Sequence, residues 1–211
     1  MAMSARSGFT LLELLVSVAL SLLIVAAVAG FSRAESRMVD RESRHLRLRE
    51  ANRRVLEMIV REVRGAGFAP VAGSFDGALD GLAVATRDRI EIRSDLHGVT
   101  TGDLPDGILD ADSDERIGFF VSATRGTVSE SVGRQTLPLT VDSTVSAGGL
   151  VFHYLGACGD EILPVAGTDL SADERARVRS ITVGLTIKEG VESAADEVAA
   201  ALRNRRSLRC P

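Results

Sequence analysis

The sequence predicts an α+β protein in which one long N-terminal helix packs on an antiparallel β-sheet. Residues 36–64 contain neither proline nor glycine and are rich in Arg, Glu, Leu and Met, which favours a helix that continues the apolar segment before it. After Pro70, short apolar runs alternate with turns rich in Gly, Asp and Ser, which predicts strands. Because no long helix separates these runs, we expect antiparallel pairing against the second half of the helix.

The apolar segment from Phe9 to Phe31 carries a single carboxylate, Glu13. From Leu14 to Ser32 no residue is charged, and this length is sufficient to span a bilayer as a helix. A charged group within a span costs about 2.5–3.5 kcal/mol on insertion scales. We therefore expect the Glu13 carboxylate to have a partner that compensates its charge, or a specific function.

The second half of the helix is predicted to be amphipathic. Val55, Ile59 and Val63, with Leu56 and Val60, recur at three- and four-residue steps and form one apolar stripe. Gly65, Ala66 and Gly67, followed by Pro70, end the helix, because glycine adopts the left-handed cap conformation and proline cannot continue the ladder. At 1.5 Å per residue the helix is about 80 Å long. Its first half must then be buried in lipid or in other subunits.

The rest of the chain is predicted to form the sheet. The β-like runs are residues 82–86, 89–96, 116–123, 135–141, 150–156 and 178–189. Alternation of apolar and polar residues is clearest at Ile90 and Ile92 and along residues 181–187. Residues 191–203 are expected to form a short helix or a loose arm.

The charge of the chain is unevenly distributed. Residues 37–64 hold nine Arg against five acidic residues, whereas residues 65–211 hold 14 Lys and Arg against 22 acidic residues. This contrast can let the helix of one copy lie against the acidic part of another, or it describes two solvated faces. With no Trp and one Tyr, the chain has few side chains on which nucleic-acid bases could stack. No nucleic-acid partner is expected.

No catalytic pattern occurs in the sequence. It has no G-x-S-x-G elbow, H-E-x-x-H pair or phosphate loop. The three histidines, His45, His97 and His153, are far apart in sequence. We therefore interpret each as a single buried or solvated residue and not as part of a metal site. We expect a protein that is not an enzyme and that requires no cofactor.

A cleaved secretory signal is one interpretation of the N-terminus. Arg6 would be its basic region, and Ala27, Val28 and Ala29 before Gly30 form an acceptable cleavage site. In this case the mature protein would be a secreted acidic domain that binds Ca²⁺ or a surface partner. The length of the apolar segment, the carboxylate of Glu13 and the helical pattern beyond Ser32 argue against it.

The residues Gly8-Phe9-Thr10-Leu11-Leu12-Glu13 resemble the processing motif of type IV prepilins and type II secretion pseudopilins. The resemblance implies that a prepilin peptidase cleaves after Gly8 and that the new N-terminal Phe9 is methylated. It further implies a subunit-assembly role for Glu13, whose carboxylate could neutralise the amine of Phe9 on a neighbouring subunit. The implied parts are a leader (1–8), a transmembrane and assembly helix (9–32), an amphipathic stem (33–67) and a β-rich pilin head (68–211).

The stretch from Arg49 to Pro70 and the order of the later strands are similar to PilW-like minor pilins. This similarity implies a structural subunit that primes or caps a type IV pilus together with other minor and major pilins and the assembly machinery. The J-type minor pseudopilin of type II secretion shares the same organisation and is the alternative. The implied location is the inner membrane with the head in the periplasm, and then a pilus or pseudopilus at the cell surface.

The distribution of arginines disagrees with this orientation. Arg33, Arg37, Arg41 and Arg44 follow the span, whereas only Arg6 precedes it, so the positive-inside rule would keep the head in the cytoplasm. The leader motif and the cysteine pair favour export. If the chain is exported, its two cysteines, Cys158 and Cys210, are expected to form one disulfide.

An Asp-rich stretch precedes the third β-like run. It holds Asp106, Asp110, Asp112, Asp114 and Glu115, whose oxygens could converge on a hard cation such as Ca²⁺. The spacing is not that of an EF-hand, because Glu115 occupies the position that requires glycine and Val121 the position of the bidentate Glu. A solvated acidic turn is the interpretation that we favour, with Ca²⁺ binding as the alternative.

Overall fold

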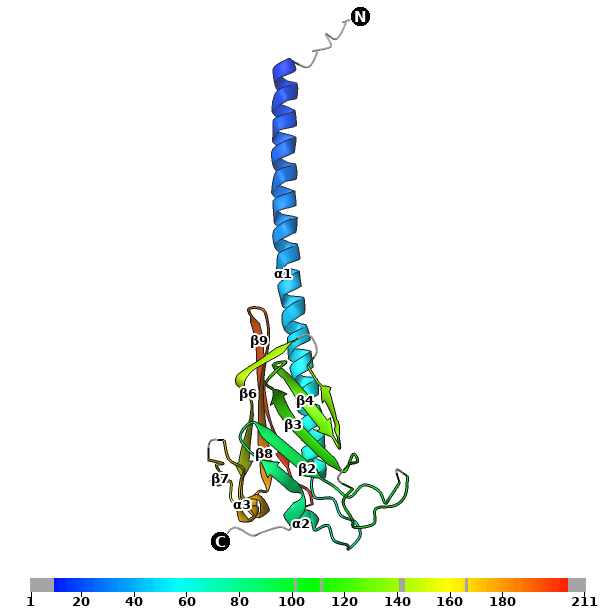
Figure 1. Cartoon of the computed structure of the whole chain (residues 1–211). Helices are drawn as coiled ribbons and strands as arrows, with labels where there is room; N and C mark the ends of the chain where they lie inside the picture. Colours follow the sequence, from blue (N-terminus) through cyan, green and yellow to red (C-terminus); the bar gives the residue numbers. More distant parts are fainter. Residues whose placement is uncertain (1–9, 101, 111, 141–142, 166, 205–211) are drawn as a thin grey trace, which may run out of the picture. The chain divides into compact units, whose positions relative to one another are not determined.

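The described part of the chain contains one long helix, two short helices and two antiparallel sheets. The computed structural model describes residues 10–100, 102–110, 112–140, 143–165 and 167–204. Helix α1, Leu11–Gly65, is its longest element (Figure 1). The chain divides into two compact units, with the boundary between Arg44 and His45 inside α1. The α+β class predicted from the sequence is confirmed.

The end of α1 is fixed by polar side chains and by a glycine. The carbonyl oxygen of Gly65 accepts hydrogen bonds from the hydroxyl of Ser94 at 3.0 Å and the amide of Asn204 at 3.1 Å. Both satisfy a carbonyl that has no partner within the helix. Gly67 has φ of 75°, and its N–H donates to the carbonyl of Arg93 at 2.8 Å. This left-handed residue turns the chain out of the helix as predicted.

Five strands form the first sheet in their chain order, each antiparallel to its neighbours. They are β1 (Leu82–Ala85), β2 (Arg89–Arg93), β3 (Arg116–Ser122), β4 (Thr127–Val132) and β5 (Gln135–Pro138). A four-residue helix, α2 (Gly77–Asp80), precedes the sheet. Ile90 and Ile92 on β2 and Phe119 on β3 are buried, so the alternation seen in the sequence marks the core side of this sheet.

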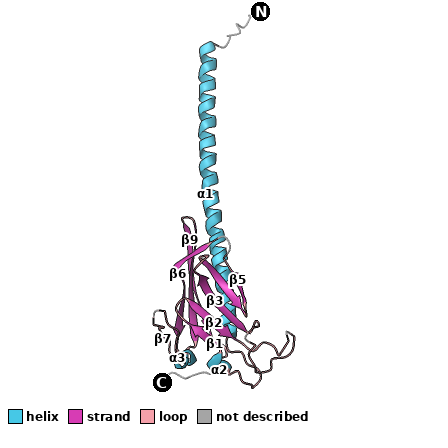
Figure 2. Ribbon diagram, in the orientation of Figure 1, coloured by secondary structure: helices cyan, strands magenta, loops and turns pink. Residues whose placement is uncertain are grey.

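Four strands form the second sheet in the order β7-β6-β8-β9, again antiparallel throughout. They are β6 (Thr144–Leu155), β7 (Glu161–Ile162), β8 (Ser180–Glu189) and β9 (Glu192–Ala201). Helix α3 (Ala172–Arg177) precedes β8 and begins at a capping box between Ser171 and Glu174. Figure 2 shows the strands of both sheets beside the C-terminal part of α1.

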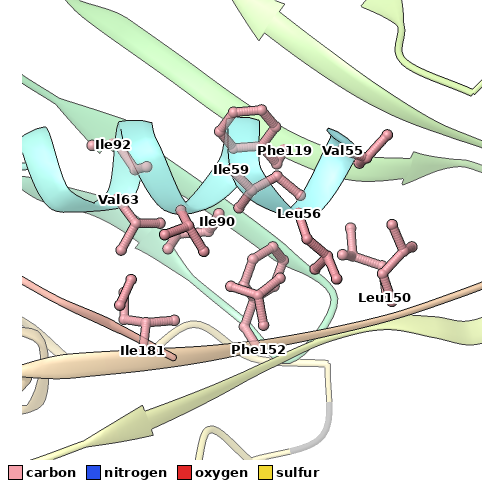
Figure 3. Packing of buried hydrophobic residues seen from close by; sticks show 14 of the residues in the cluster. Val55, Leu56, Ile59, Val63, Ile90, Ile92, Phe119, Leu150, Phe152 and Ile181 are labelled. Carbon is pink, nitrogen blue, oxygen red and sulfur yellow. The ribbon is translucent and has the colours of Figure 1, made fainter. Parts of the chain in front are cut away.

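The hydrophobic core of the second unit lies between α1 and both sheets. The apolar stripe predicted on the helix is buried, with Ile59 and Val63 fully inaccessible to solvent. Figure 3 shows these side chains among Phe119 of the first sheet and Phe152 and Ile181 of the second. Burial of such large side chains contributes about 1.5–3 kcal/mol each relative to exposure. The stripe therefore joins the helix to two sheets at once.

Two expectations about the sheet are corrected by the structure. The strands form two sheets rather than the single sheet that we predicted. Residues 192–201 form strand β9, not a helix or a loose arm, because β9 pairs with β8 over its whole length. Gly190, with φ of 61°, permits the two-residue turn that joins them. This pairing overrides the helical preference of an alanine-rich segment.

Candidate functional site

Glu13 lies in the first turn of α1. Its backbone N–H donates to the carbonyl of Thr10 at 3.1 Å, and the Thr10 hydroxyl lies 3.4 Å from the same nitrogen. A carboxylate in the first turn interacts favourably with the positive end of the helix dipole. In the described part of the chain, the Glu13 carboxylate forms no ion pair. The next charged residue along the helix is Arg33.

The apolar segment of α1 from Leu11 to Phe31 presents its side chains outward. Leu11 is 79% exposed and Phe31 is 72% exposed, and the large apolar residues between them are also exposed. This part of α1 is long and apolar enough to cross a membrane, and its most apolar stretch is buried against no other described residue. A cleaved signal sequence would meet the same criteria of length and composition.

Two hydroxyl groups in this segment, those of Ser17 and Ser21, are satisfied within the helix. Ser17 donates to the carbonyl of Glu13 and Ser21 to that of Ser17, each at 2.8 Å. In a bilayer every polar group needs such an internal partner, because no water is present to provide one. Glu13 has the only charged side chain of residues 10–32. In a bilayer this charge would require a partner from outside the helix.

The sequence comparison agrees with this geometry. Residues 3–29 match the family model described as the prokaryotic N-terminal methylation motif. The motif supports the class of type IV pilins and pseudopilins. Proteins of this class are structural subunits, and the apolar helix suits an anchor in the inner membrane. No curated protein and no solved structure matched the chain.

The matched range includes the residues that are expected to take part in cleavage, methylation and subunit assembly. Gly8, Phe9 and Glu13 all lie within it. Gly8 and Phe9 are outside the residues that the structure describes, so cleavage after Gly8 and methylation of Phe9 stay predictions from the motif. The role of Glu13 in registering subunits also stays a prediction, because no neighbouring subunit is present.

The Asp-rich loop of the head is organised around Glu115, which is 1% exposed. Its Oε1 accepts from the N–H groups of Leu96 at 2.7 Å and His97 at 3.0 Å. Its Oε2 accepts from the N–H of Asp110 at 2.7 Å. A buried carboxylate that accepts three backbone N–H bonds ties the two loop segments together. Glu115 thus has a structural role that the sequence did not reveal.

The aspartates expected beside Glu115 have separate partners. Asp112 makes a bidentate ion pair with Arg134 at 2.7 and 2.8 Å, and the carboxylate of Asp106 accepts from the N–H of Ile108 at 2.8 Å. Asp114 contacts Nε2 of His97 at 2.8 Å. Of the five predicted ligands, only Asp110 and Glu115 approach each other together with His97, within 4.8 Å. Ca²⁺ binding stays a prediction.

His97 carries the most perturbed acid–base group of this loop. Its ring is buried, and Nδ1 lies 2.7 Å from the carbonyl oxygen of Gly98. The hydrogen bond to Gly98 and then that to Asp114 raise the pKa of His97 from 6.5 to about 8. His97 is therefore a cation in the folded head at neutral pH, and it offsets the carboxylates around it.

The predicted disulfide falls partly outside the described residues. Cys158 is exposed in the turn between β6 and β7, where Gly156 donates to the carbonyl of Asp160 at 2.8 Å. Cys210 belongs to residues 205–211, which the structure does not describe. The bridge between Cys158 and Cys210 stays a prediction.

Proposed function

We propose that this protein is a minor pilin of the PilW-like group that primes or caps a type IV pilus. The observation that carries the proposal is the methylation motif at the start of an unburied apolar segment of α1, residues 11–32, whose one carboxylate is Glu13. The matched motif also occurs in pseudopilins, so a J-type minor pseudopilin of type II secretion is the second candidate. The genes beside this one separate the two: pilus motor and minor-pilin genes, or secretion-system genes.

The proposed mechanism is assembly by neutralisation of two charges. Prepilin peptidase removes residues 1–8 at the inner membrane, and the amine of Phe9 is methylated. Before assembly the span anchors the subunit with its head in the periplasm. In the helical bundle, the carboxylate of Glu13 meets the amine of Phe9 on a neighbouring pilin. Two groups that are each costly in an apolar medium then compensate each other when the subunits are in register.

N-terminal sequencing and mass measurement of the mature protein test this proposal. We expect a chain that begins with methylated Phe9. A Gly8→Val variant should accumulate as full-length precursor, because the peptidase must fit the backbone beside a residue without a side chain. Ala29→Val is the matched control, since it would block only a signal peptidase that cuts after Ala29. A mature chain beginning at Gly30, or normal processing of Gly8→Val, would refute the proposal.

A further inference from the structure

A groove of about 740 Å³ lies between the C-terminal part of α1 and strand β9. Its apolar part is formed by Val60 of α1, Val198 of β9 and Phe68, which follows α1 in the chain. Val60 is 5% exposed, whereas Val198 and Phe68 are 36% and 40% exposed. Apolar side chains that stay open to solvent on a concave surface are typical of binding sites. The groove is separate from Glu13 and from the Asp-rich loop.

Hydrogen bonds on both sides of Arg203 hold this residue at the groove. The N–H of Leu202, which is 6% exposed, donates to the carbonyl of the residue before β8 at 2.9 Å. The side-chain amide of Asn204 donates to the carbonyl oxygen of Gly65 at the end of α1, at 3.1 Å. Because both neighbours are fixed, Arg203 lines the groove while its side chain stays exposed.

Two arginines of the groove have charges that are not compensated. Arg64 and Arg203 are exposed, and neither forms an ion pair with another described residue. The third arginine that lines the groove, Arg61, is paired with Glu62 at 2.9 Å. Glu57, the acidic residue of the lining, is paired with another arginine of α1 at 2.7 Å. The groove therefore combines two available guanidinium groups with an apolar floor.

We propose that this groove, lined by Arg64, Arg203, Val60, Val198 and Phe68, binds a segment of a different protein that carries carboxylate side chains beside apolar ones. Guanidinium groups bind carboxylates in bidentate pairs, and the floor would bury the apolar side chains of the segment. Strand β9 is also the edge strand of its sheet, so backbone groups on its free side can pair with an extended segment. This assigns a binding site in the head, which the proposed function does not contain.

Other occupants fit the groove less well. A bilayer surface is flat and would not reach the floor of a groove. Nucleic acid would match the charge, but bases stack on aromatic side chains, and among the described residues of the lining only Phe68 is aromatic. The chain's own residues 205–211 hold three Arg and no acidic residue, so they share the charge of the groove.

A second copy of the chain also lacks a suitable segment. In the described part of the chain, the acidic residues lie in helices, in paired strands or in loops that hydrogen bonds hold in place, as Asp88 and Asp106 do. None of these is a free extended segment that could enter the groove of another copy. We therefore assign the groove to a different protein.

Binding of a defined peptide to the full chain in mild detergent tests the proposal. The probe is a short labelled peptide that alternates Glu with Leu and Val, and its binding is followed by fluorescence anisotropy. Arg64→Glu and Arg203→Glu should each weaken binding about tenfold, because a charge-assisted pair is replaced by repulsion. Arg49→Glu is the matched control, since Arg49 is exposed on the same helix and lies outside the groove. It should bind the peptide like the wild type.

Altered probes test the two parts of the groove on the wild-type protein alone. A peptide with Lys in place of Glu should not bind, and one with Ser in place of Leu and Val should bind about tenfold more weakly. If the serine peptide binds as well as the original, or if a DNA oligonucleotide binds more tightly, the groove is a general anion site and the proposal is wrong.

Two further results would also overturn the proposal. One is equal binding by Arg64→Glu, Arg203→Glu and Arg49→Glu. The other is self-association of the wild type, measured by sedimentation velocity, that the acidic peptide abolishes, because the groove would then belong to a second copy. Neither prepilin peptidase nor a pilus enters these measurements, so their failure would leave the proposed function standing.

Discussion

Arg116 holds the buried carboxylate of Glu91 through two hydrogen bonds, from Nε to Oε1 at 2.6 Å and from Nη2 to Oε2 at 3.1 Å. The Glu91 side chain is only 3% exposed. Arg89 and Arg93 lie further away, at 3.7 and 3.8 Å. A similar bidentate pair, Arg134 with Asp112, is exposed to solvent on both sides. The chain therefore contains two bidentate Arg–carboxylate pairs, one with a buried carboxylate and one exposed to solvent.

Removing one partner of each pair should have very different consequences. Arg116→Met leaves the carboxylate of Glu91 with weaker compensation, and we expect a loss of about 1–3 kcal/mol in the free energy of unfolding. Arg134→Met should cause no measurable change, because exposed pairs contribute little. Urea denaturation of both variants in the same detergent makes the comparison. Equal effects would show that burial does not decide the strength of these pairs.

His97 should make the stability of the head depend on pH. Its pKa in the folded state is about 8, above the value of 6.5 for the unfolded chain. Protonation of His97 therefore stabilises the fold, fully below pH 6.5 and progressively less as pH rises through about 8. The free energy of unfolding should fall between pH 6 and 9, and His97→Gln should flatten that fall. The same slope in both proteins would contradict this assignment.

Two neighbouring glycines should respond oppositely to alanine. Gly67 has φ of 75°, and a Cβ there would overlap the carbonyl of Gly77. Gly67→Ala should cost at least about 1–2 kcal/mol from the left-handed backbone alone. Gly65 ends α1, and a Cβ there would meet nothing within 4 Å, so Gly65→Ala should be neutral or slightly stabilising. Thermal unfolding of the two variants is the measurement, and a stable Gly67→Ala would refute the argument.

The helix could be predicted because its signals are local. The stripe from Val55 to Val63 and the glycines after it lie within one short stretch, and they determine both the buried face and the end of α1. β9 could not be predicted, since its strand conformation depends on pairing with β8 rather than on its alanines. Nor does alternation along a strand specify its neighbours, so the sequence pattern does not distinguish two sheets from one.

The same distinction applies to the candidate sites. The processing motif is contiguous, so Gly8, Phe9 and Glu13 can be selected from the sequence alone, and all three lie within the residues that the family model matches. In the Asp-rich loop, the partners are distant in sequence: Arg134 for Asp112 and His97 for Asp114. The backbone amides that bind Glu115 carry no sequence signal at all. Spacing alone could not show which carboxylates were already engaged.

Glu13→Val should separate assembly from membrane anchoring. The substitution removes the only charge of the span, so membrane insertion should hold or improve. Assembly should fail, because the amine of a neighbouring Phe9 would lose its partner and remain an uncompensated charge in an apolar bundle. A simple anchor would show only the first effect.

Two measurements test Glu13→Val. Membrane fractionation reports its insertion, and its recovery in sheared fibres or in crosslinked complexes with other pilins reports its assembly. Ser17→Val is the matched control, since Ser17 lies one turn further along the helix and its hydroxyl bonds within α1. It should insert and assemble like the wild type. If Glu13→Val is recovered in the complexes as well as Ser17→Val, the carboxylate has no part in placing subunits in register. Its retention in the span would then need another cause.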